Sequence, residues 1–124
     1  MTDIASIQQK LISLLQQHQS CLKVTANNAD KFEVCGTVET MQGKKKVDGI
    51  YFASVVPKPA DVRFYFFPTY THKEQLGELP GNLKKALKGK SCFHIKKMDD
   101  EFEQNLKNLI DKAVTLYKAD GWLA

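Results

Sequence analysis

The chain has 124 residues, of which 43% are hydrophobic and 26% are charged. These fractions are typical of one globular domain, and they exclude a disordered chain, a fibrous repeat and a membrane protein. Lysine and arginine number 18 against 14 acidic residues, a net charge of +4 that does not by itself indicate a nucleic-acid-binding protein. We therefore expect a single domain over residues 1–124.

Apolar spacing predicts an amphipathic helix over residues 3–18. Its apolar stripe consists of Ile4, Ile7, Leu11, Leu14 and Leu15. Thr2 or Asp3 can cap the first turn by accepting backbone N–H bonds. The polar segment 25–30, which reads TANNAD, predicts a loop because Asn and Asp favour turns.

Three strands are expected next. Residues 32–38 alternate between apolar and charged side chains, the pattern of a half-buried strand. Residues 47–56 are apolar on both faces, which is typical of a central strand covered on both sides. Residues 62–67 are mostly aromatic. The turns at 42–45 and 57–61 are too short for parallel crossovers, so these strands should pair antiparallel.

Short helices are expected after Pro68, one from Thr71 through Leu76 and one over residues 80–88. Gly89 stands where a left-handed cap would end the second helix. Residues 90–96 alternate again and predict a fourth strand.

The last helix has the strongest signals. Asp100 and Glu103 form a capping-box-like start, Lys118 lies in the last turn, and Gly121 ends the helix. Its apolar stripe consists of Phe102, Leu106, Leu109, Ile110, Ala113, Val114 and Tyr117. The expected order is α-β-β-β-α-α-β-α. It describes a two-layer α+β domain, with an antiparallel sheet of four to five strands packed with the N- and C-terminal helices.

The chain shows no export signal and no membrane span. Its first thirty residues lack a basic start and an apolar stretch, and no apolar run is long enough to cross a bilayer. We therefore expect a cytoplasmic protein without membrane contacts. Cys21, Cys35 and Cys92 form no CxxC motif, so we expect three free thiols, at least two of them buried.

Six lysines and no acid lie between Lys84 and Lys97, and Lys88, Lys90 and Lys96 are candidate anion contacts. The string KGKS is not a phosphate loop, because it lacks the earlier glycine and the preceding strand. An anion-binding or nucleic-acid-binding edge is one alternative reading. The single arginine argues against nucleic acid as a partner, since its readers rely on the guanidinium fork.

Cys92 and His94 are two residues apart and should share one face of a strand. With Cys35 and His72 they could form a zinc or other metal site, or they could be a structural thiol and an edge histidine. No serine elbow, HExxH motif or paired catalytic carboxylates are present. We expect a protein without a cofactor and favour one without enzymatic activity. The alternative class is an enzyme or a metal carrier that uses Cys92, His94 and His72.

The aromatic strand should place rings on both faces of the sheet. Helices at the two ends of the chain can cover only one face. The second face then needs the short helices 71–88, a second protomer or a ligand as its cover. We predict a non-enzymatic accessory domain that presents this face to a small molecule or a protein partner, with a homodimer as an alternative. The candidate ligand-binding residues on this face are Tyr65, Phe67, Tyr70, Cys92 and His94.

Three segments carry a resemblance to a known family. They are residues 48–70 (DGIYFASVVPKPADVRFYFFPTY), residues 87–97 (LKGKSCFHIKK) and residues 117–122 (YKADGW). Over about residues 30–123 the chain resembles the YdhG-like small bacterial domains of unknown function. The resemblance implies an α+β fold and a cytoplasmic protein. Part of that family is linked with frataxin-like iron delivery, so an iron-binding or metal-binding carrier is a further alternative. Iron binding of that type relies on an acidic ridge, whereas this chain is basic.

Overall fold

The first predicted helix forms as α1 (Ile4–Gln16) in the computed structural model, which describes residues 2–124. The Asp3 carboxylate caps it by accepting a hydrogen bond from the Ser6 amide at 3.0 Å. The last predicted helix forms as α5 (Asp100–Ala119), and its cap is Asp99, which accepts from the Phe102 amide at 2.8 Å. Among residues 2–124, no helix combines the length and the apolar character that a membrane span requires.

The main sheet has six antiparallel strands in the order β1-β2-β5-β6-β8-β7. Their bounds are β1 (Leu22–Asn28), β2 (Lys31–Gly36), β5 (Tyr51–Pro57), β6 (Val62–Phe66), β7 (Leu87–Lys88) and β8 (Cys92–Ile95). A separate two-stranded sheet consists of β3 (Thr40–Gln42) and β4 (Lys45–Val47). The α+β class, with an antiparallel sheet packed against terminal helices, is confirmed.

The loop expected over residues 25–30 is wrong, because β1 runs to Asn28. The Asn28 side chain accepts from the backbone amides of Asp30 and Lys31 at 2.9 and 3.0 Å, so the turn signal applies only to the tight connection into β2. Most of β1 is exposed at the edge of the sheet. It therefore lacks the apolar alternation by which a strand is recognised.

The strand expected over residues 47–56 begins later, at Tyr51. It is central, as predicted, since β5 lies between β2 and β6. Both of its parities are apolar because the register shifts: Val34 pairs with Ala53 but Cys35 pairs with Tyr51. This bulge buries both Phe52 and Ala53 completely. The odd- and even-numbered residues of β5 are thus both buried although helices cover only one face of the sheet, so the expected cover on both faces is wrong.

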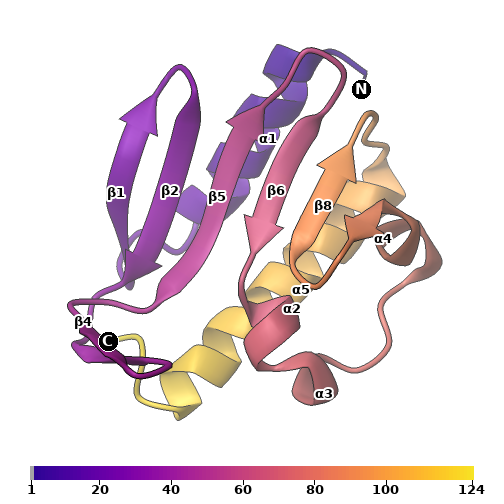
Figure 1. The fold of residues 1–124 in the computed structure, drawn as a ribbon. Helices are drawn as coiled ribbons and strands as arrows, with labels where there is room; N and C mark the ends of the chain where they lie inside the picture. The colour runs from indigo at the N-terminus through magenta and orange to yellow at the C-terminus, as the bar shows by residue number, and fades with distance from the viewer. Residues whose placement is uncertain (1) are drawn as a thin grey trace.

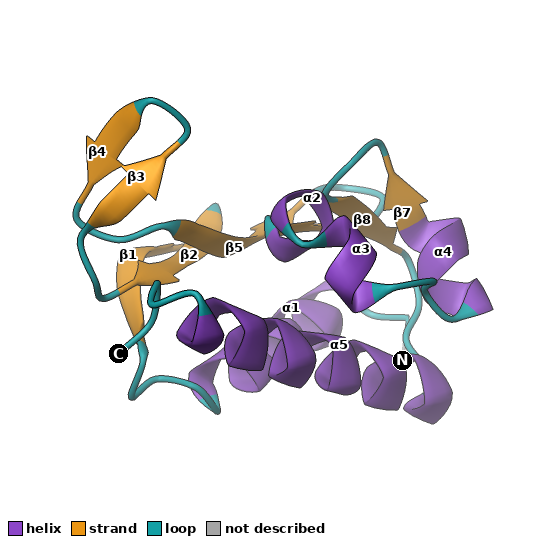
Figure 2. Ribbon diagram, turned by 90° about the horizontal axis from the view of Figure 1, so that it is seen from below, coloured by secondary structure: helices purple, strands orange, loops and turns teal. Residues whose placement is uncertain are grey.

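Figure 2 shows α1 and α5 together beneath one face of the sheet. The short helices are α2 (Pro68–Thr71), α3 (Lys73–Leu76) and α4 (Gly81–Ala86). Leu76 of α3 and Leu83 of α4 are buried in the same core as α1 and α5. The other face of the sheet, turned toward the viewer in Figure 1, has no helix over it. The short helices therefore do not cover the strands of this face, and α2 contacts only its end, where the Tyr70 ring stacks on Phe67.

Candidate functional site

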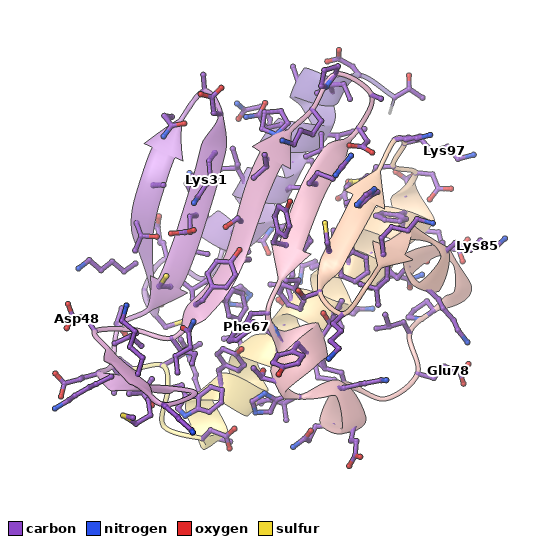
Figure 3. The ribbon with its side chains drawn as sticks, in the orientation of Figure 1. Lys31, Asp48, Phe67, Glu78, Lys85 and Lys97 are labelled. Carbon is purple, nitrogen blue, oxygen red and sulfur yellow. The ribbon has the colours of Figure 1, made fainter. Side chains whose placement is uncertain are left out.

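Tyr65 and Cys92 are neighbours on the uncovered face of the sheet. The register of β6 and β8 pairs Tyr65 with Cys92 and Arg63 with His94. The alternating side chains of these strands are buried against the helices. Phe67 follows β6 at the end of this face, where Figure 3 shows it beside α2. The structure thus brings four of the predicted ligand residues to one face.

An aromatic row crosses the end of the face. The ring of Phe67 lies 5.6 Å from that of Tyr51 and 5.8 Å from that of Tyr70, measured between centroids. The Lys90 ammonium lies 5.3 Å from the Tyr70 centroid, a cation–π geometry. Burial raises the pKa of Tyr51 to about 12, so its phenol stays neutral. Tyr70 is 53% exposed and offers the largest free surface of the row.

Cys92 and His94 do not form an activated pair. Burial raises the pKa of the Cys92 thiol above its usual value, which disfavours the thiolate that a nucleophile or metal ligand needs. The His94 Nδ1 lies 3.7 Å from a carboxylate oxygen of Asp61. That carboxylate is buried, and it accepts from the Arg63 Nε at 2.8 Å. His94 therefore lies beside the Asp61–Arg63 ion pair on the sheet.

The metal set considered from the sequence is not assembled. Cys35 lies on β2 and Cys92 on β8, three strand spacings apart in the sheet order, or roughly 14 Å. His72 is buried elsewhere, with its ring against Tyr117 of α5. Within residues 2–124, no three His, Cys, Asp or Glu side chains lie close enough together to hold a metal ion.

The three cysteines are free thiols, as expected, but their burial differs from the prediction. Only Cys21 is buried, whereas Cys35 and Cys92 are half-buried. Both half-buried thiols lie on the uncovered face, where no helix excludes solvent from them. Burial also raises the pKa of Cys35.

The six lysines between Lys84 and Lys97, hereafter the basic edge, do not gather around one binding site. Lys88 lies on β7 and Lys96 follows β8, and both are exposed. Lys90 differs, because its ammonium is held over the Tyr70 ring. Of the three predicted anion contacts, Lys90 is the one that borders a candidate binding site.

That site is a cavity of about 470 Å³ between α2–α3 and α4–β7, hereafter the Lys90 cavity. Its volume falls within the range of small-molecule sites, roughly 300–1,000 Å³. The apolar part of the wall is formed by Tyr70, Leu76, Leu79 and Leu87. The charged side chains around it are Lys73, Glu78, Lys84 and Lys90.

Two glycine turns shape the cavity. Gly77 has a φ of 73° and ends α3, after which the chain loops out to α4 and carries Leu79. Gly89 has a φ of 71° and turns the chain between β7 and β8. The buried Thr69 hydroxyl lies 2.9 Å from the carbonyl oxygen of Lys90. This contact fixes the turn against α2.

Residue spacing in the sequence does not indicate this cavity. Tyr70 came from the predicted ligand set and Lys90 from the predicted anion set, and only the structure shows that they meet. The one sequence signal for a turn beside an apolar wall is segment 76–80 (LGELP), in which two leucines flank a Gly-Glu pair and a proline follows. The depth of the cavity depends on how α2 and β7 pack, which the spacing of residues does not specify.

Comparison of the chain with family models, curated proteins and solved structures finds no match. The resemblance to YdhG-like domains therefore stays a prediction.

Proposed function

We propose that this chain is a non-enzymatic accessory protein that binds a small molecule in the Lys90 cavity. The observation that carries the proposal is the cavity itself, whose volume suits a small ligand and whose wall is largely apolar. Leu79 and Leu87 are only half-buried there, and Tyr70 is exposed. A ligand would remove this apolar surface from water, which favours binding.

The chemistry of the neighbouring side chains supports binding over catalysis. Burial keeps the Cys92 thiol protonated, and His94 contacts Asp61 rather than a nucleophile. The wall of the cavity contributes lysines, a glutamate and a buried threonine. The Thr69 hydroxyl is used in backbone contacts, 2.7 Å from the carbonyl oxygen of Phe66 and 2.9 Å from that of Lys90.

The test is a fluorescence titration with N-phenyl-1-naphthylamine, a neutral probe that brightens in apolar sites. We expect saturable binding to the wild-type protein. Leu79→Trp should narrow the cavity and weaken binding several-fold, because the larger ring takes up part of the space that the probe would occupy. Leu87→Trp narrows the same cavity from β7 and serves as a second variant.

Val24→Trp is the matched control, since Val24 is 48% exposed on the edge strand β1. It adds the same ring outside the cavity and should leave the affinity unchanged. Far-ultraviolet circular dichroism and the melting temperature show whether each variant is folded. Absence of saturable binding to the wild type, or equal affinity in folded Leu79→Trp and Leu87→Trp, would refute the proposal. Native mass spectrometry of freshly purified protein additionally shows whether a small molecule is carried along.

A further inference from the structure

The charges around the Lys90 cavity are unbalanced. Three lysines and one glutamate border it. The Glu78 carboxylate lies 3.3 Å from the Lys84 ammonium, so these two charges offset each other. Lys73 and Lys90 have no carboxylate within 4.0 Å in the described chain, residues 2–124. Two cations therefore stand unpaired beside an apolar wall.

Although Lys90 is exposed, contacts with neighbouring residues hold its backbone and its ammonium group in place at the cavity. Its backbone is fixed by the Gly89 turn and by the contact with the Thr69 hydroxyl. Its ammonium lies over the Tyr70 ring at the border of the cavity. An ammonium group has three N–H donors and no acceptor, so at this position it can donate to an anion. Lys73 borders the same cavity from α3.

We infer that the Lys90 cavity binds a free small amphipathic carboxylic acid. The carboxylate accepts hydrogen bonds from Lys90 and Lys73, and a short acyl or aryl body lies against the leucines of the wall. This inference rests on the proposed function and specifies its ligand class. A lysine ammonium donates to a carboxylate or a phosphate as a point charge, without the planar fork by which arginine holds either group bidentately. We take the carboxylate as the head group because it is the smaller of the two and carries a single charge, and octyl phosphate tests this choice below. The only arginine, Arg63, lies on β6 and not in the wall of the cavity.

Three probes with the same chain and different head groups test the inference: octanoate, octanol and octylammonium. Affinities are measured by displacement of N-phenyl-1-naphthylamine at low ionic strength. We expect octanoate to bind about tenfold more tightly than octanol, because a hydrogen bond to a charged group contributes on the order of one such factor. Octylammonium should bind most weakly, since its charge is repelled by the two unpaired lysines. Octyl phosphate is a fourth probe, and tighter binding of it than of octanoate would overturn the carboxylate as the head group.

The variants Lys90→Gln and Lys73→Gln should each weaken octanoate several-fold while leaving octanol unchanged. Lys97→Gln removes the same charge from the far end of the basic edge, where Figure 3 shows Lys97 pointing away from the molecule. It should leave both affinities unchanged. All three residues are exposed, and a melting temperature verifies that each variant is folded.

The outcomes separate this inference from the proposed function. Equal affinities for octanoate and octanol, with no effect of the lysine variants, would overturn the acid as ligand and leave a neutral ligand in the cavity. Failure of N-phenyl-1-naphthylamine and of every chain compound to bind would overturn both. An equal loss in Lys97→Gln and Lys90→Gln would show that only the general positive charge attracts octanoate, which also overturns the inference.

Discussion

Gly49 and Gly36 pass so close to each other that a Cβ on Gly49 would lie 1.8 Å from the Gly36 carbonyl oxygen. The Gly36 amide donates to the Ile50 carbonyl oxygen at 2.8 Å, which joins the end of β2 to the segment entering β5. A Cβ on Gly36 would also lie 2.7 Å from the Trp122 carbonyl oxygen. Three segments that are distant in sequence therefore meet at this point, and only glycine fits there.

Gly49→Ala should destabilise the fold by about 3 kcal/mol or more, since a backbone atom must move to accept the methyl group. Gly81→Ala is the matched control, because a Cβ there meets nothing within 4 Å and its φ is not positive. Urea unfolding measures both free energies. A Gly49→Ala protein as stable as the wild type would contradict the close approach.

The His72 side chain joins α2 and α3 to the C-terminal segment. Its Nδ1 lies 2.8 Å from the Thr71 hydroxyl, and its Nε2 forms a short hydrogen bond with the Asp120 carboxylate. Its ring packs against Tyr117 and Trp122 at centroid distances of 5.1 and 5.2 Å. His72→Ala should cost about 3 kcal/mol of unfolding free energy, because it leaves a cavity and removes both hydrogen bonds.

Trp122 reports on this change directly, and we expect its emission to shift to the red in His72→Ala as water reaches the indole. Tyr117→Phe is the milder companion variant. It removes only the contact of the Tyr117 hydroxyl with the Thr71 hydroxyl at 3.0 Å, and should cost about 1 kcal/mol. Equal losses in the two variants would argue against a central role for His72.

Acid should weaken the network around Glu33. Desolvation of Glu33 disfavours its charged form. Hydrogen bonds with Thr25, Lys31 and Ser54, together with the Lys31 charge, outweigh this desolvation and lower the pKa of Glu33 below 4.5. Because the unfolded chain takes up the proton first, Glu33 contributes stability that is fully present above pH 4.5. This contribution is lost as the pH falls through the lower folded pKa.

Glu33→Gln tests this pH dependence. The variant should be less stable than the wild type at pH 7, and the difference should shrink toward pH 3. Glu74→Gln removes the same charge from an exposed position on α3 and serves as the matched control. Urea midpoints at several pH values give the comparison. A constant gap between Glu33→Gln and the wild type would exclude Glu33 as a source of acid sensitivity.

The periodic spacing of apolar residues correctly predicted the helices and strands that bury one regular face. The stripe of α5 and the alternation of β6, with Phe64 inside and Tyr65 outside, both formed as expected. β1 was missed because a polar edge strand buries too little to need an apolar pattern. The bulge at Phe52 is a matter of register, which residue type does not encode.

The sequence indicated single residues of the candidate site but not their arrangement, because the arrangement depends on tertiary contacts. Residue types indicated an exposed ring at Tyr70 and a cation at Lys90, and each was assigned to a different surface. The distance between them depends on the Gly89 turn and on the packing of α2. Those are tertiary contacts between segments about twenty residues apart in the chain.

Cys92 should react slowly with iodoacetamide at neutral pH. Burial raises the pKa of its thiol above 9.0, so the thiolate, which is the reactive form, is scarce at pH 7. We expect the alkylation rate to rise about tenfold per pH unit, without a plateau below pH 9. Peptide mapping by mass spectrometry after timed labelling separates Cys92 from Cys35 and Cys21.

His94→Ala is the decisive companion variant for this thiol. The His94 ring contacts Asp61, so its removal should leave the rate profile of Cys92 unchanged. An ion pair between the two residues would give fast labelling at pH 7 in the wild type and a lower rate in His94→Ala. The double variant Cys92→Ala, His94→Ala should also keep the wild-type affinity for N-phenyl-1-naphthylamine, because neither side chain borders the Lys90 cavity. Loss of probe binding in a folded double variant would instead place the ligand site on the uncovered face of the sheet.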